Sequence, residues 1–252
     1  MARSLLPREH GAYVQLLAPL VLAIAATRGS LAAWLLVLAA CAAFVANEPL
    51  LVLLGHRGKR AHDQDQVRAR WMLAVFATLA AAAGIAGLVL APPAARVMAG
   101  IVAVPTLLLV LLGWLRKQRT LVGEAIAVIA LTGASVPVET AAGMSWRTAV
   151  LLWVAWACGY GCTILAVHRV IERGKGSRSG FDVASGLAFL VVGAALAILA
   201  FRDFALVAGI PLSLGAGIVA LLAPPPAKLR PIGFAMVGAS LLSIGLLLSV
   251  HP

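Results

Sequence analysis

Polar side chains interrupt the long apolar runs of this chain at a few places, and these side chains could do chemistry. Arg8, Glu9 and His10 open the first apolar run, and Asn47 and Glu48 stand near the end of the second. A carboxylate in apolar surroundings must find a cationic partner or take up a proton. Polar groups in or beside a membrane span therefore mark a functional site by default.

The remaining candidates lie in the fifth and sixth apolar runs: Glu124, Tyr160, His168, Arg169, Glu172 and Arg173. His168 and Glu172 are four residues apart, so a helix would stack them on one face. Such a pair could bind one metal ion or form a hydrogen-bonded acid–base pair. The alternative is that these side chains are interfacial groups in contact with water and lipid headgroups.

The composition indicates which elements hold these side chains. Of the 252 residues, 62% are hydrophobic and 12% are charged, whereas soluble domains have about 45–50% and about 25%. This balance excludes a soluble fold. Nucleic-acid binding requires a basic face with interleaved aromatic residues, but here the charges form short clusters between apolar runs. We therefore expect no nucleic acid among the partners.

Nine apolar runs are long enough to be membrane spans, since a helix needs roughly 20 residues to cross the hydrocarbon core. The expected spans are 11–27, 31–54, 71–91, 97–115, 120–138, 148–171, 183–201, 204–222 and 232–250. The sequence thus predicts an all-α, polytopic membrane bundle of about nine transmembrane helices. Because the remaining connections are short, we expect a single multi-spanning domain over residues 1–252.

The basic residues orient this bundle. Among the 20 Lys and Arg, all but four fall on one side of the nine-span arrangement, and the exceptions are Arg28, Arg96, Arg147 and Arg202. Cytoplasmic connections retain Lys and Arg, so we predict a cytoplasmic N-terminus and a C-terminus outside. The net charge of +11 is first an orientation signal.

Local features add four expectations. The basic segment Gly55–Arg70 is expected to be a loop that binds anionic lipid headgroups. Pro49 either ends the second span near residue 46 or kinks it, and the tight Arg202–Asp203 connection predicts an antiparallel hairpin of the seventh and eighth spans. In the outer half we expect few polar groups beyond Glu139, Arg147 and Asp203 at the rim.

The opening Pro7-Arg8-Glu9-His10-Gly11-Ala12-Tyr13 resembles the YwiC-like family of bacterial integral membrane proteins. Members typically begin with a Pro-x-x-His-Gly-Ala segment that runs into the first span, and Pro19, two turns later, also fits. The resemblance implies a multi-pass protein of the bacterial cytoplasmic (inner) membrane. The resemblance does not imply any particular activity.

The arrangement of spans also resembles, more distantly, the UbiA-like intramembrane prenyltransferases. In those enzymes, Asp-rich motifs at the cytoplasmic ends of the second and sixth spans hold magnesium and a prenyl diphosphate. The motifs fall here on Asn47 with Glu48, and on His168 with Glu172. The resemblance implies Glu48, His168 and Glu172 as catalytic residues. Glu48 and Glu172 are the ligands that magnesium would use, although two carboxylates leave most of its octahedron open.

Arginine and histidine can hold a phosphate group directly, without a metal. We therefore predict that the other candidates bind substrate: Arg8, Glu9, His10, Asn47, Glu124, Tyr160, Arg169 and Arg173. The expected ligand is an isoprenoid or quinone-type anionic lipid in a cavity that faces the cytoplasm.

Three functions stay open at this point. The first is a degenerate UbiA-like membrane enzyme or lipid-binding protein, and the second is a small transporter or lipid carrier with the same cavity. The third is a structural or assembly subunit whose cytoplasmic charges contact a protein partner. The asymmetric placement of Pro105, Pro137 and Pro211 argues against a transporter, whose broken spans occupy matching positions in two halves.

Overall fold

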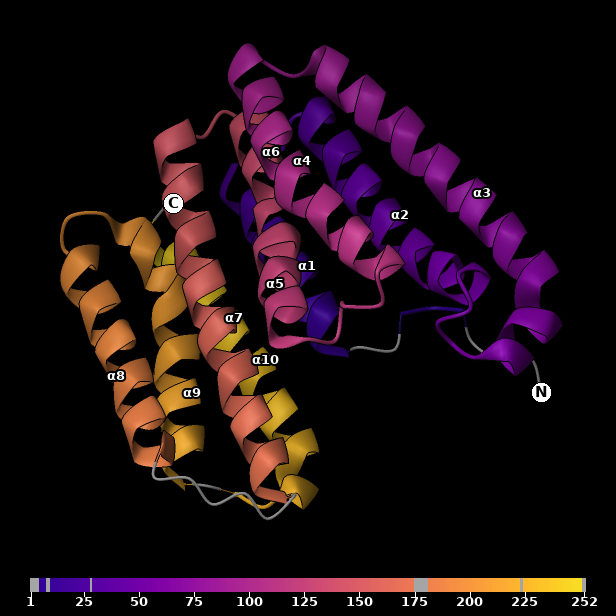
Figure 1. Ribbon diagram of the computed structural model, residues 1–252. Coiled ribbons are helices and arrows are strands. Elements are labelled where there is room, and N and C mark those ends of the chain that lie inside the picture. The colour runs from indigo at the N-terminus through magenta and orange to yellow at the C-terminus, as the bar shows by residue number, and fades with distance from the viewer. Residues whose placement is uncertain (1–4, 8–9, 28, 175–180, 223, 251–252) are drawn as a thin grey trace. The chain divides into compact units, whose positions relative to one another are not determined.

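The computed structural model describes residues 5–7, 10–27, 29–174, 181–222 and 224–250, and these residues form helices and short connections without a β-strand (Figure 1). The α-helices are α1 (His10–Thr27), α2 (Leu31–Leu53), α3 (Lys59–Leu90), α4 (Pro93–Trp114), α5 (Leu121–Gly133), α6 (Ser135–Ala141), α7 (Trp146–Gly174), α8 (Phe181–Ala200), α9 (Ile210–Leu222) and α10 (Leu229–Val250). Two 3₁₀ helices, η1 (Phe204–Gly209) and η2 (Pro226–Lys228), precede α9 and α10.

The predicted polytopic helical fold is confirmed. In the part of the chain that the structure describes, seven helical segments are long and apolar enough to cross a membrane. They are Leu31–Leu53, Lys59–Leu90, Pro93–Trp114, Leu121–Ala141, Trp146–Gly174, Phe204–Leu222 and Pro226–Ser249. Gly11–Thr27 and Ala184–Ala200 are shorter apolar helices at the two other predicted spans. The count of nine crossings and the sides of the two termini stay predictions.

The helices form two compact units. Unit 1 contains Met1–Leu16 and Ala23–Trp146, and unit 2 contains Leu17–Leu22 and Arg147–Pro252. The prediction of one domain stays a prediction, and the two units are described separately below.

In unit 1, α2 and α3 pack along their lengths, as Figure 1 shows. Small residues permit this approach, since a side chain on Gly87 would lie 3.0 Å from Leu36, and one on Gly84 would contact Ala39. Ser30 starts α2, because its hydroxyl oxygen accepts a hydrogen bond from the Ala33 amide at 3.1 Å. The helix then continues through Pro49 to Leu53, so Pro49 does not end the second span near residue 46.

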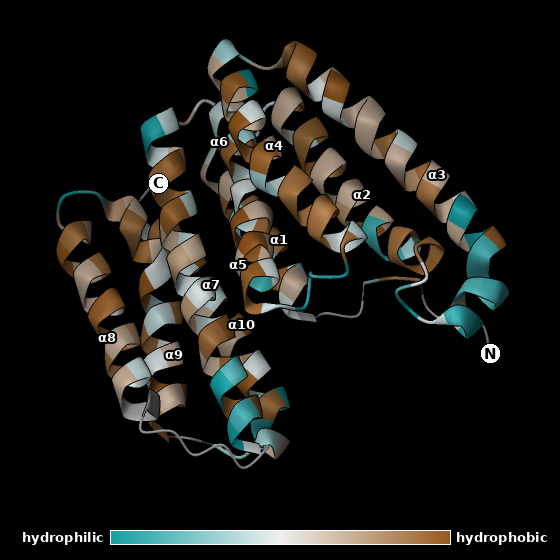
Figure 2. Ribbon diagram, in the orientation of Figure 1, coloured by the Kyte–Doolittle hydropathy of each residue, from teal (hydrophilic) through white to brown (hydrophobic). Residues whose placement is uncertain are grey.

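The helix α3 begins earlier than the sequence analysis expected. The predicted loop Gly55–Arg70 is wrong beyond residue 58, because α3 starts at Lys59. The segment after Gly58 is rich in Lys, Arg, Gln and Ala, which favour helices. With 32 residues, α3 is about 48 Å long, whereas the hydrocarbon core is about 30 Å thick. Its hydrophilic first turns (Figure 2) therefore extend the helix well past an apolar span.

The predicted fifth span is broken in the structure. Its first part, α5, ends at Gly133, and its second part, α6, begins at Ser135. Pro137 explains the break, because a proline has no amide hydrogen to donate to the carbonyl of Gly133, four residues earlier. The seven residues of α6 are all buried in unit 1.

Unit 2 contains the hairpin that the sequence predicted. The helices α8 and α9 pack against each other, with Gly186 opposite Leu221 and Gly193 opposite Leu214. This order of contacts is antiparallel. Asp203 in the tight connection caps η1, since its carboxylate accepts a hydrogen bond from the Ala205 amide at 3.2 Å.

We predict that Gly209→Ala destabilises the protein by about 1–3 kcal/mol, because a methyl group at Gly209 would overlap the Ala155 carbonyl of α7. The matched control is Gly161→Ala, whose methyl group would enter open space and would favour the helix. Thermal unfolding in detergent measures both effects. Equal unfolding midpoints for the two variants would contradict this close contact.

Candidate functional site

A tight turn joins α2 to α3 and returns the chain toward the end of α2. The Gly55 amide donates to the Val52 carbonyl, and the His56 amide donates to the Leu51 carbonyl. This pair of bonds is a Schellman motif, which requires a left-handed residue directly after the helix. Gly55 meets that requirement with φ +73°, at no steric cost.

The turn brings Arg57 onto Glu48, and this ion pair is the centre of the candidate site. The Nε of Arg57 donates to Oε1 of Glu48 at 2.8 Å, and a terminal guanidinium nitrogen donates to Oε2. Glu48 is only 2% exposed. The sequence left two alternatives for a carboxylate in apolar surroundings, a cationic partner or a proton, and Arg57 provides the partner. Such a two-bond pair holds the guanidinium in one orientation.

The N-terminal part of the chain contributes to the surroundings of this pair. Tyr13 of α1 is close enough to Glu48 to interact with its charge, and its ring meets Phe44 edge to face at 4.9 Å. Leu5 is buried against Val52 and Ala69. Leu5 and Tyr13 therefore pack beside the end of α2.

The connection from α4 to α5 makes the same kind of turn with a different residue. The Arg116 amide donates to Gly113, and the Lys117 amide donates to Leu112, again as in a Schellman motif. The residue in the left-handed position is Arg116, with φ +60°, where a side chain costs about 1–2 kcal/mol relative to glycine. A basic side chain thus occupies a position that favours glycine.

The two turns lie close together in unit 1. His56 of the first turn interacts with Arg116 of the second, and both connections are on the same side of the unit in Figure 1. Partial burial, with the charges of Arg116 and Arg57, lowers the pKa of His56 below its ordinary value. We call this surface the basic end: it comprises His56, Arg57, Lys59, Arg60, Arg116, Lys117 and Arg119.

The other unit 1 candidates lie near these elements. Asn47 is half-buried beside Glu48 on α2, and Glu124 is in the first turn of α5, where the helix dipole favours an acidic side chain. Arg8 and Glu9 lie outside the described residues, and so does the side chain of His10.

Four of the unit 2 candidates, His168, Arg169, Glu172 and Arg173, lie at the end of α7, a hydrophilic stretch in Figure 2. Glu172 is exposed and forms an ion pair with Arg169, one turn earlier, at 3.2 Å. Arg173 donates to the Ala220 carbonyl at 2.9 Å and so caps the last turn of α9. His168 is half-buried.

Tyr160 lies within the packed interior of unit 2 and not at its polar end. It is 3% exposed, its ring stacks on Trp156, and its hydroxyl is 2.9 Å from the Ser240 hydroxyl. Because Ser240 donates its hydrogen to the Met236 carbonyl, Tyr160 is the donor to Ser240.

The acidic residues do not fit the magnesium that the UbiA-like resemblance implies. Both oxygens of Glu48 accept hydrogen bonds from Arg57, and Glu172 pairs with Arg169. Among the described residues, no group of three or more His, Cys, Asp or Glu side chains is arranged to hold a metal ion. We therefore derive no chemistry through magnesium.

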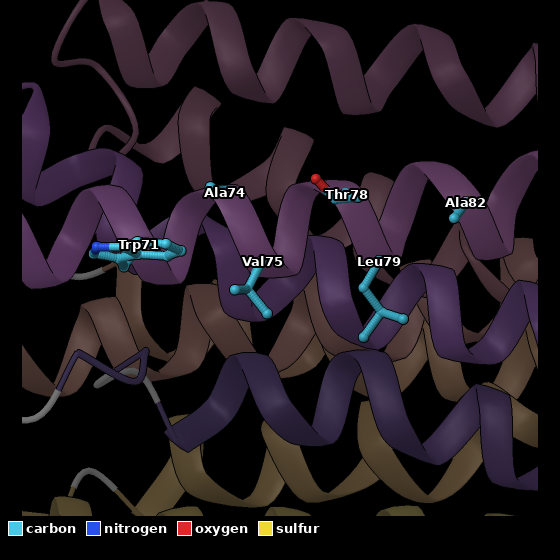
Figure 3. Close-up of a pocket in the computed structure, with 6 residues that line it drawn as sticks. All are labelled: Trp71, Ala74, Val75, Thr78, Leu79 and Ala82. Carbon is cyan, nitrogen blue, oxygen red and sulfur yellow. The ribbon is translucent and has the colours of Figure 1, made fainter.

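An open hollow of about 560 Å³ lies along one face of α3 (Figure 3). Its lining residues are spaced three or four apart: Trp71, Ala74, Val75, Thr78, Leu79 and Ala82. Trp71 is 71% exposed. The hollow is apolar and starts directly after Arg70, where the hydrophilic turns of α3 end.

Three residues of this region were missed by the sequence analysis as site residues. Arg57 was placed only within the basic segment Gly55–Arg70, and Arg116 only among the residues that orient the bundle, although the glycines around Arg57 indicated a turn. Glu139 was expected at the outer rim, and it does lie near the end of the apolar segment Leu121–Ala141. What the sequence did not indicate is that this residue is 0% exposed inside unit 1. The sequence feature that could have drawn attention to Glu139 is Pro137, two residues earlier, because this proline breaks the helix.

These features define a multi-pass integral membrane protein with a buried ion pair and a basic end in its first unit. A family model described as YwiC-like protein matches residues 6–139, which is more than half of the chain, so the chain belongs to the YwiC-like family. The matched segment contains Glu48, Arg57, Arg116 and Glu139. Comparison with curated proteins and with solved structures finds no match.

We predict that Arg57→Gln lowers the free energy of unfolding by about 3–5 kcal/mol, because it leaves the Glu48 carboxylate buried without its partner. The double variant Glu48→Gln, Arg57→Gln should be more stable than Arg57→Gln alone, since no unpaired charge remains. The control is Arg60→Gln at an exposed position, expected within about 0.5 kcal/mol of the parent. Thermal unfolding of these proteins in detergent, together with the single variant Glu48→Gln, gives the coupling energy of the pair. Strictly additive effects of Glu48→Gln and Arg57→Gln would argue against the pair.

Proposed function

We propose that this protein binds the headgroup of an anionic, isoprenoid or quinone-type lipid at the basic end of unit 1. The observation that carries the proposal is that the charges of Arg57 and Arg116, which come from two different turns, both act on His56. Arginine is suited to phosphate because its planar fork donates two parallel hydrogen bonds. In the predicted orientation, this end faces the cytoplasm of a bacterial inner membrane.

The form of α3 supports an amphipathic ligand. The exposed Lys59 and Arg60 lie in its first turn, and the apolar hollow begins at Trp71 on the same helix. A headgroup at the basic turns would allow its apolar tail to follow the helix toward this hollow. The tail would then remain in hydrocarbon surroundings while the charge remains at the interface.

Arg116 supports a binding role over a purely topological one. A cytoplasmic connection requires positive charge, but any exposed position satisfies that requirement. Arginine in a left-handed position instead reduces stability where glycine would not. In this proposal Glu48 is a positioning residue, because it acts by holding Arg57, and the catalytic roles suggested for His168 and Glu172 are not needed.

The direct test is native mass spectrometry of the protein in mild detergent with added farnesyl monophosphate. We predict that Arg116→Gly weakens binding about tenfold, the effect of losing a charge-assisted hydrogen bond of at least about 1.5 kcal/mol. The same variant should unfold at a higher temperature, because the left-handed strain is relieved.

The matched control is Arg147→Gly with the same probe, since Arg147 is exposed and is predicted on the opposite side of the membrane. Its farnesyl monophosphate binding should equal that of the parent protein. Equal weakening by both variants would show a general charge effect and contradict the site. A stoichiometric protein partner with no bound lipid would support the subunit alternative instead.

The pKa of His56 provides a second prediction. Because partial burial and the charges of Arg116 and Arg57 lower this pKa, the imidazole is neutral at neutral pH. Arg116→Gln should raise the pKa, and a bound anionic headgroup should raise it further by favouring the imidazolium form. NMR of labelled histidine rings across a pH series measures both shifts. If the pKa of His56 does not change when farnesyl monophosphate is added, the headgroup binds elsewhere.

A further inference from the structure

A second acidic residue is buried in unit 1, and its surroundings differ from those of Glu48. Glu139 lies in α6, directly after the break in the fifth span, and is 0% exposed. In the part of the chain that the structure describes, neither carboxyl oxygen has a hydrogen-bond partner. The proposed lipid site does not use this residue.

The hydroxyl groups beside Glu139 donate their hydrogens elsewhere. Ser135, one turn earlier, donates to the Thr132 carbonyl at 3.1 Å. Thr140 donates to the Val136 carbonyl at 2.8 Å. An ionised carboxylate accepts hydrogen bonds only, and these neighbours leave it no donor. The neutral acid carries no charge that needs donors, so these surroundings favour it over the carboxylate.

The charged groups on the neighbouring elements do not compensate a carboxylate here. The helices α2 and α4 pack against α6. The start of α2 lies beside α6, because the Ser30 hydroxyl donates to the Ala141 carbonyl. The charged group of α2 is Glu48, which is near the opposite end of that helix. On α4 it is Arg96, which donates to carbonyls at the end of α3. On α5 it is Glu124, in the first turn, roughly 22 Å along the helix axis.

We propose that Glu139 is a proton-binding site of this protein, in which the carboxyl group holds a proton at neutral pH. An isolated ionised carboxylate in a protein interior costs far more than the neutral acid, and no described cation offsets that cost. Release of the proton therefore requires α6 to rearrange so that water reaches the carboxylate. The break between α5 and α6 allows this movement, because the helix ladder is already interrupted at Pro137.

The first test uses dicyclohexylcarbodiimide, an apolar reagent that needs a protonated carboxyl group. The acid transfers its proton to a carbodiimide nitrogen, and the carboxylate oxygen bonds to the central carbon. We expect a single covalent adduct on Glu139 in the full-length protein, located by peptide mass spectrometry, that decreases as the pH rises. Glu48 should stay unlabelled, because both of its oxygens accept hydrogen bonds from Arg57.

Two variants serve as controls for the labelling. Glu139→Gln should abolish the adduct, and Glu124→Gln should leave it unchanged. Arg28→Gln should also leave it unchanged; Arg28 lies two residues before Ser30 and outside the described residues. If Glu139→Gln fails to fold, the position of the adduct in the parent protein still decides the question.

The second test measures the coupled movement. Hydrogen–deuterium exchange of residues 134–141, corrected for the intrinsic pH effect, should increase several-fold as the pH rises in the parent protein but not in Glu139→Gln. Failure of Glu139 to label at any pH where the protein is folded would overturn the proposal. An adduct that appears only in Arg28→Gln would show an ion pair instead, and protection by sodium ions at constant pH would indicate a metal-cation site.

Discussion

The ion pair between Glu48 and Arg57 is the interaction on which the organisation of unit 1 depends. A carboxylate that is 2% exposed needs a partner inside the protein, because desolvation of a lone charge is expensive. Arg57 can reach Glu48 only if the chain reverses directly after α2, and Gly55 permits that reversal. The reversal sets the start of α3, and α3 then carries its basic first turns beyond the apolar span.

Glu48 and Glu139 show two solutions to one physical problem. Glu48 stands at the end of a helix, where a following turn can return a guanidinium to it. Glu139 stands in a short helix whose seven residues are all buried, and its neighbours donate their hydrogens to carbonyl oxygens. The first carboxylate is satisfied by an ion pair, whereas the second is stable as a neutral acid. The two residues therefore suit different roles.

Much of the fold followed from composition and periodicity. The apolar runs predicted the helices, and the tight Arg202–Asp203 connection predicted the hairpin of α8 and α9, because short connections leave no other arrangement. The helical start of α3 was missed, since charged residues were assumed to form a loop although they favour helices. The break at Pro137 was noted only as an asymmetric proline, because hydropathy averages over the residues that interrupt a helix.

The sequence by itself determined that this is a multi-pass helical membrane protein and where its scarce acidic residues lie along the chain. Hydropathy and charge are local properties, so a linear reading captures them. Only the tertiary structure decided which charged side chains lie close to one another. Arg57 pairs with Glu48, Arg116 approaches His56, and Glu139 is enclosed, because these contacts depend on how turns and helix packing place side chains in space.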